Sequence, residues 1–213
     1  MKKIALFSGL MLVGLYGYGQ ALKPIELLRP DLSRGKNAMM AFSERASVQN
    51  FDTTMLSLRD MSDLLWAANG INRPQSGKRT APSAMNTQEV AVYMCTSHGI
   101  YLYDAQAHVL NPVAEGDYRN LVAGMQTWAA NAPLICLLVA DTSKFPRGDE
   151  TLRNTWAAID VGIVSQNISL FCASVGIGTR PRASMDTEKL TSVLKLGEHS
   201  KVLLNHPVGY GKK

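Results

Sequence analysis

The stretch Pro133-Leu134-Ile135-Cys136-Leu137-Leu138-Val139-Ala140-Asp141 is apolar without interruption between its proline and its aspartate. Because a strand with one exposed face alternates polar and apolar residues, this unbroken run predicts a central strand buried on both faces. The longest helical pattern of the chain follows over residues 151–175, and Gly176 is suited to end it. Its apolar stripe consists of Val161, Val164, Ile168, Phe171 and Val175. We therefore expect a buried strand and a long core helix at the centre of the fold.

Shorter elements extend outward from this pair. Residues 89–96 and 100–104 are rich in Val and Tyr and predict a hairpin, whose turn holds a solvated His98. Ser57 begins an amphipathic helix that Asn69-Gly70 ends. The remaining expected elements are helices over 38–43, 117–129 and 186–195, a loop over 71–81 and a last strand near 201–204. This alternation along one length of chain predicts a single α+β domain with a mixed sheet between helices.

Composition excludes several classes of function. The formal net charge of the 213-residue chain is +5, without a dense Lys/Arg run or interleaved aromatic and basic residues, so we expect no nucleic-acid partner. The four histidines lack the spacing of metal ligands, and no metal site is predicted. The three cysteines lie in apolar stretches and are interpreted as small buried hydrophobes: Cys95, Cys136 and Cys172.

The first 21 residues are typical of a secretory signal peptide. Lys2 and Lys3 precede an apolar run over 4–18, which is short for a membrane span, and small residues at Gly19 and Ala21 suit a signal peptidase. We expect cleavage near Ala21, a periplasmic or secreted protein, and no membrane span after cleavage. An uncleaved N-terminal anchor is the alternative. Residues 22–44 are predicted to form an N-terminal arm.

Two short segments carry the candidate chemistry. Arg45, Ser47 and Gln49 alternate in a segment that is predicted to be extended, so their side chains share one side. A guanidinium and a hydroxyl on one side suit a phosphate, although an Arg-x-Ser triplet alone is usually a solvated loop. The second segment is Pro82-Ser83-Ala84-Met85-Asn86-Thr87-Gln88, which taken alone is a loop between a helix and a strand.

Four segments in order resemble the flavin-binding signature of the nitroreductase-like FMN oxidoreductases: 45–52, 82–88, 160–178 and 181–184. The resemblance covers residues 45–213 and implies one FMN-binding domain. It also implies a nitroreductase-like fold with a central mixed, mainly antiparallel sheet flanked by helices, and a homodimer with flavin at the interface. The segment 99–104, with His108 and Leu110 after it, is similar to the branch that includes the SagB-type dehydrogenases.

The resemblance implies a role for each candidate residue. Arg45 and Ser47 bind the flavin phosphate, while Gln49 stands where the family has a second basic residue. Lys212 or Lys213 is therefore expected to meet the remaining phosphate charge. The backbone amides of the Pro181–Ser184 turn face flavin N5 and O4, and Ala183 stands where the family often has an acidic residue. The other implied contacts are Pro82, Ser83, Ala84 and Asn86 from the partner subunit, Gln126 at the pyrimidine edge, and Pro181 and Ser184 in the turn.

The implied function is an FMN-dependent oxidoreductase that passes hydride or electrons through flavin N5 to or from a small organic substrate. Nitroaromatics, quinones and dehydrogenation substrates are the classes expected. No catalytic side chain is predicted, and NAD(P)H as donor stays open because it is scarce outside the cytoplasm. The alternative is a non-catalytic exported protein that binds flavin or another small ligand on the same scaffold. A hydrolase is disfavoured because the sequence has no Gly-x-Ser-x-Gly, His-Glu-x-x-His or phosphate-binding Gly-rich motif.

Overall fold

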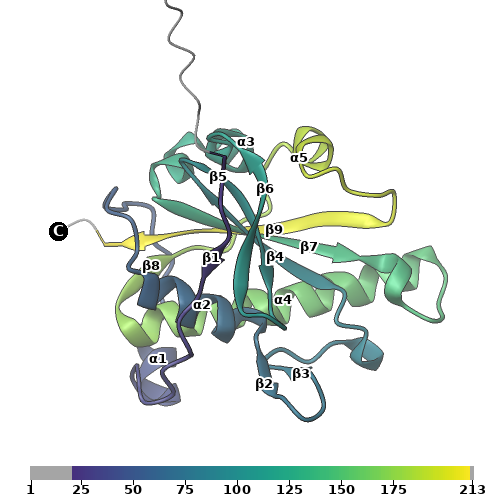
Figure 1. Cartoon of the computed structure of the whole chain (residues 1–213), viewed down its shortest axis with the longest axis horizontal. Coiled ribbons are helices and arrows are strands. Elements are labelled where there is room, and N and C mark those ends of the chain that lie inside the picture. The colour runs from purple at the N-terminus through teal and green to yellow at the C-terminus, as the bar shows by residue number, and fades with distance from the viewer. Residues whose placement is uncertain (1–20, 212–213) are drawn as a thin grey trace, which may run out of the picture.

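The computed structural model describes residues 21–211, so the predicted signal segment 1–20 and the lysines Lys212 and Lys213 lie outside the described residues. Seven strands form one sheet in the order β1-β6-β5-β4-β7-β9-β8 (Figure 1). Their bounds are β1 Ile25–Glu26, β4 Val90–Thr96, β5 Gly99–Asp104, β6 Val109–Glu115, β7 Leu134–Asp141, β8 Ile177–Thr179 and β9 Ser200–Tyr210. The strands β2 (Ile71–Arg73) and β3 (Lys78–Arg79) form a separate small hairpin.

The helices lie on both faces of the sheet. Figure 1 shows α2 and α4 on one side and α3 and α5 on the other. The α-helices are α1 Ala38–Glu44, α2 Leu58–Asn69, α3 Arg119–Ala123, α4 Glu150–Val175 and α5 Thr187–Val193. The short 3₁₀ turns are η1 Ala84–Asn86, η2 Thr127–Asn131 and η3 Thr142–Lys144.

The strand β7 lies near the middle of the sheet, as its sequence predicts. It pairs antiparallel with β4 over 134–140 and with β9 on its other edge. Alternate residues of β7 face opposite cores. Leu134, Cys136 and Leu138 pack toward α2 and α4, and Ile135 and Leu137 pack toward α3 and α5. Every named ladder of this sheet is antiparallel, which confirms the α+β fold with a mainly antiparallel sheet.

The helix α4 is the long core helix that the apolar stripe predicts. The side chain of Asp149 caps its first turn by accepting from the Leu152 N–H at 2.8 Å, and Gly176 ends it in the left-handed conformation with φ 73°. By length and composition α4 could also cross a membrane, since its mean hydropathy reaches 1.4. However, Val161, Val164 and Ile168 are buried against the sheet and α2. A core helix of this kind passes the same test of length and composition.

The structure confirms the hairpin of β4 and β5 with an exposed His98, the helices at 38–43 and 57–69, and the burial of all three cysteines. Three predicted elements differ. Residues 71–81 form the β2–β3 hairpin as well as loop, the last strand runs over 200–210, and 117–129 is not one helix. Gly124 breaks that segment with φ 56°, where an added Cβ would meet the backbone of Met185 at 3.1 Å. The division into signal peptide, arm and domain stays a prediction.

Candidate functional site

The segment after α1 runs along the outer edge of the sheet. Ser47 pairs with Thr179 of β8, and the Val48 N–H donates to the Thr179 carbonyl at 3.0 Å. Val48 is half-buried against the edge, whereas Arg45, Ser47 and Gln49 are all exposed. Within residues 21–211 the Arg45 guanidinium forms no hydrogen bond or ion pair. This edge therefore presents a guanidinium, a hydroxyl and an amide toward solvent.

Arg182 is the most heavily bonded cation of this region, and the sequence analysis did not single it out. Its side chain is buried and donates to five oxygens, three of which are backbone carbonyls. The acceptors are Gln126 Oε1 at 2.7 Å, Asn205 Oδ1 at 2.8 Å, and the carbonyls of Ala123 at 2.6 Å, Ser184 at 3.0 Å and Val122 at 3.4 Å. Burial, followed by the charge of Arg180, lowers the pKa of Arg182. Arg182 thus joins α3, β9 and the turn after β8.

The Trp128 ring lies close to two cations. The guanidinium carbons of Arg180 and Arg182 are 5.6 Å and 5.3 Å from its ring centre, and Phe51 stacks on it with ring centres 6.5 Å apart. Neither arginine forms an ion pair within the described range 21–211. Arg180 directly follows Thr179, which pairs with Ser47, so it adds a half-buried cation to the edge that carries Arg45. The Arg-Pro-Arg triplet at 180–182 is the sequence signal that points to it.

The turn over 181–184 exposes backbone donors. Pro181 and Ala183 are exposed and Ser184 is half-buried. The Arg182 N–H donates to Asn205, whereas the N–H groups of Ala183 and Ser184 donate to no acceptor within residues 21–211. Gln126 does not lie inside a helix as expected. It precedes η2, and its side-chain oxygen is held by Arg182.

The Pro82–Gln88 loop is held in a strained conformation. Met85, Asn86 and Gln88 have φ values of 54°, 56° and 50°, in the left-handed region that costs most non-glycine residues about 1 kcal/mol. The Ala84 N–H donates to Asp160 Oδ2 on α4 at 2.8 Å, and Ser83 Oγ accepts from the Gln88 N–H at 2.9 Å. Pro82, Met85 and Asn86 are exposed, whereas Ser83 and Ala84 are half-buried.

One chain does not bring its two motifs together. The 82–88 loop is bonded to Asp160 in the middle of α4, whereas Ser47 lies against β8, which follows the end of α4 at Gly176. Sixteen residues of helix separate these points, which is roughly 24 Å at 1.5 Å per residue. In Figure 1, β8 lies on the left and the turn between β3 and β4 lies on the right. The expected phosphate and ring contacts therefore lie apart within one protomer.

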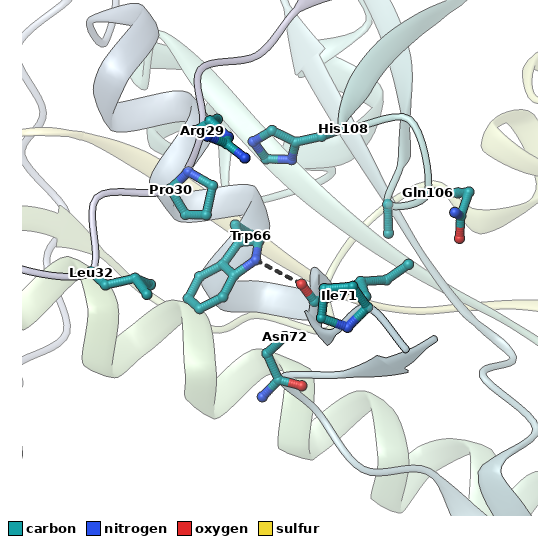
Figure 2. A pocket seen from close by; sticks show the side chains of 10 residues that line it. Arg29, Pro30, Leu32, Trp66, Ile71, Asn72, Gln106 and His108 are labelled. Carbon is teal, nitrogen blue, oxygen red and sulfur yellow. Dashed lines mark hydrogen bonds between the residues drawn. The ribbon is translucent and has the colours of Figure 1, made fainter. Parts of the chain in front are cut away.

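A hollow of about 560 Å³ lies away from both motifs (Figure 2). Its lining includes Arg29, Pro30, His108 and Trp66, whose indole N–H donates to the Ile71 carbonyl at 3.1 Å. His108 is itself fixed, because its ring nitrogens contact the Leu28 carbonyl at 2.8 Å and the Tyr103 hydroxyl at 2.9 Å. None of the residues predicted to bind flavin lines this hollow.

A buried Ser–His pair has the residue types of a nucleophile and its base. His206 Nε2 is 2.7 Å from Ser165 Oγ, and its Nδ1 is 3.2 Å from Thr179 Oγ1. Both His206 and Ser165 are buried, and burial lowers the pKa of His206 to about 3. A neutral imidazole without solvent access holds α4 to β9 rather than reacting with a substrate. Residues 21–211 also contain no group of side chains suited to a metal ion.

The chain is similar to known proteins in sequence and in fold. The profile of the Nitroreductase family matches residues 42–210. A protein of Methanocaldococcus jannaschii whose name assigns it to the nitroreductases is 28% identical over 196 residues, which are 87% of this chain and 96% of that protein. A crystal structure from Ralstonia eutropha JMP134, similarly named, has a TM-score of 0.83 and 32% identity over 92% of both chains. A chain of the E. coli microcin synthetase complex has a TM-score of 0.67 over 98% of this chain and 85% of that chain, and its 18% identity shows the fold alone.

Proposed function

The chain belongs to the nitroreductase family, whose profile spans most of it, and from this premise we propose that it is an FMN-dependent oxidoreductase acting on a small organic molecule. The observation that carries the proposal is the edge beside β8. There the exposed Arg45 and Ser47 lie in the segment that pairs with Thr179, the residue before Arg180, and no carboxylate within residues 21–211 forms an ion pair with either arginine. Such a set of donors and positive charges suits a phosphate.

The residues of the chain fit the flavin in two further respects. The unpaired N–H groups of Ala183 and Ser184 suit the acceptor atoms of the flavin ring, and their fixed positions would stabilise negative charge there. Arg182 adds a buried positive charge beside this turn, and its hydrogen bond to the Ser184 carbonyl holds the turn in place. Flavin, when bound, supplies hydride and electron transfer to a second substrate. The protein itself supplies binding, orientation and a positive field.

Loss of the phosphate donors is expected to release the cofactor. The Arg45→Ala, Ser47→Ala double variant should bind FMN about a hundredfold more weakly, because each charge-assisted hydrogen bond contributes about 1.5 kcal/mol or more. Titration of the apoprotein with FMN, followed by flavin fluorescence, measures this. Gln49→Lys adds a cation on the same edge and should tighten binding, whereas the exposed Arg73→Ala should leave it unchanged. A wild-type protein that takes up no FMN would refute the proposal.

We infer that the functional unit is a homodimer, because the motifs lie apart in one chain and apolar side chains are exposed on α1 and α4. Met39, Phe42 and Ile159 are 76%, 55% and 55% exposed, which is typical of an interaction surface. In such a dimer the Pro82–Asn86 loop of one subunit would complete the phosphate edge of the other.

Mixing two defective variants tests the shared site. One carries Arg45→Ala and Ser47→Ala. The other carries Asn86→Gly, which removes the amide while glycine keeps the left-handed backbone. Each homodimer should bind FMN weakly at both sites, and refolding an equal mixture should restore one tight site in each mixed dimer. If the mixture binds no better than the separate variants, both motifs act within one subunit and the shared site is wrong.

The electron donor and acceptor distinguish an enzyme from a non-catalytic flavin-binding protein. We propose export on the strength of the 1–21 segment, and a branch similar to the SagB-type dehydrogenases on the strength of residues 99–110. An exported member would meet little NAD(P)H, so stopped-flow bleaching of the flavin by NADH or NADPH is the discriminating measurement. If neither NADH nor NADPH reduces the flavin, a nicotinamide is not the electron donor and that version of the proposal is rejected. A flavin that is reduced chemically but passes no electrons to quinones or nitroaromatics would favour a non-catalytic flavin-binding protein.

A further inference from the structure

Two carboxyl groups are buried together beneath the 82–88 loop. Glu89 follows the loop directly and is 1% exposed, and Asp160, on the facing side of α4, is 4% exposed. Buried carboxylates are normally paired with cations, because an unpaired buried charge is strongly unfavourable. Neither residue forms an ion pair within residues 21–211. The pair therefore needs another source of stabilisation.

The hydrogen bonds of Glu89 indicate what that source is. Its Oε2 accepts from the Thr87 hydroxyl at 2.8 Å, but its Oε1 is buried and has no donor within residues 21–211. Asp160 and Glu89 are joined through the same loop, because Asp160 Oδ2 accepts from the Ala84 N–H and Thr87 bonds both the Ala84 carbonyl and Glu89. Two ionised carboxylates have no hydrogen to give each other, whereas one proton between them satisfies the unpaired oxygen. A proton on the pair would give the unpaired Oε1 a hydrogen-bond partner.

The charges around the pair leave it without a direct counter-ion. Arg79, on β3, acts on Glu89 only through its charge, while its Nε donates to Gln88 Oε1 at 3.0 Å. Lys144, on η3, donates to the Gln88 carbonyl at 3.3 Å. Burial is the largest cause that raises the pKa of Glu89 to about 7. Hydrogen bonds from its own backbone and from Thr87 oppose the rise in pKa, and the neighbouring Asp160 carboxyl adds to it.

The same pair holds the strained loop. Asp160 Oδ2 accepts from the Ala84 N–H, and Thr87 bonds both Glu89 and the Ala84 carbonyl at 3.0 Å. These are the contacts at the base of the segment in which Met85, Asn86 and Gln88 have positive φ. A second negative charge beside Asp160 would draw neighbouring donors and water toward the pair and weaken the Ala84 anchor.

We propose that Glu89 and Asp160 share one proton, and that this proton positions the Pro82–Asn86 loop for the flavin. Glu89 is then a positioning residue that acts through Asp160 and Thr87. The first half of the proposal concerns the apoprotein alone, and the second half rests on the proposed FMN binding. Above neutral pH the proton leaves, the loop loosens and flavin binds more weakly.

The test compares wild type with Glu89→Gln at pH 6 and pH 8.5. Glutamine keeps the shape and donates a permanent hydrogen to Asp160. In the apoprotein, amide exchange at Ala84, taken relative to its intrinsic rate, should accelerate about tenfold in wild type between the two pH values and stay constant in the variant. FMN affinity should weaken about tenfold further in wild type than in the variant. The variant also corrects for the titration of the FMN phosphate itself.

Two substitutions at Asp160 complete the test. Asp160→Asn keeps an acceptor for Ala84 and donates to Glu89, so it should also remove the pH dependence, whereas Asp160→Ala should expose Ala84 to exchange at both pH values. Equal pH dependence of Ala84 exchange in wild type and Glu89→Gln overturns the shared proton. A shared proton without any matching change in FMN affinity overturns the positioning role. Absence of FMN binding at either pH, with the exchange pattern intact, rejects the flavin proposal and leaves the proton sharing supported.

Discussion

The Arg182→Met variant is expected to lower the free energy of unfolding by about 3–5 kcal/mol. Methionine fills much of the same volume but removes all the donors that the guanidinium provides to Gln126, Asn205 and three carbonyls. Each buried acceptor that loses its donor costs about 1–3 kcal/mol, and relaxation of the exposed Gln126 reduces the sum. The loss should affect stability first and flavin affinity second, since the turn over 181–184 would lose its anchor.

Urea denaturation followed by circular dichroism measures this loss, and Arg180→Met is its matched control. Arg180 lies over the same Trp128 ring at a similar distance, but it is half-buried and donates to no protein acceptor within residues 21–211. Its replacement should change the free energy of unfolding by less than about 1 kcal/mol. Equal destabilisation by the two substitutions would show that contact with Trp128, and not the hydrogen bonds, carries the effect.

The elements that the sequence predicts well are those with a strong local pattern. The strand β7 and the helix α4 can be predicted from neighbouring residues. In β7 every position but the last is apolar, and in α4 an apolar residue recurs at each helical turn. The strand β6 was missed because Pro112 interrupts it, and the structure accommodates this proline at a register shift between Ile100 and Tyr101. Pro207 and Gly209 similarly interrupt the strand pattern in the second half of β9. These strands are specified by their partners across the sheet rather than by their own pattern.

Some residues of the candidate site can be predicted from a local motif, and others cannot. The Arg-x-Ser and Pro-Ser-x-x-Asn segments are contiguous, so a motif identifies them. Arg182 with Asn205, and Glu89 with Asp160, are pairs separated by 23 and 71 positions, and only the folded chain joins them. The expected replacement for the missing charge at Gln49 was a C-terminal lysine, which lies outside the described residues. Arg180 supplies a second candidate, because Thr179 pairs with Ser47 across the sheet edge.

Glu89→Gln is expected to stabilise the protein by about 3 kcal/mol at pH 8 and to have little effect near pH 4.5. The pKa of Glu89 rises from 4.5 in a model peptide to about 7 in the folded protein. Below pH 4.5 the carboxyl is protonated in both states, so its stabilising contribution is fully present. Between pH 4.5 and 7 the unfolded chain releases the proton while the folded protein keeps it, and the free energy of unfolding falls as pH rises. Above pH 7 the loss is complete, at 1.36 kcal/mol for each unit of raised pKa.

The measurement is the difference between the unfolding free energies of Glu89→Gln and wild type, taken by urea denaturation from pH 4.5 to 8.5. The difference cancels the titrating groups outside the pair, so its rise through this window reports the proton that Glu89 and Asp160 share. Glu115→Gln, at an exposed carboxyl at the end of β6, is the control for replacing a surface glutamate by glutamine. A difference that is flat for Glu89→Gln would mean that Glu89 is ionised in the folded protein at neutral pH. The buried Oε1 would then need a donor other than a proton shared with Asp160.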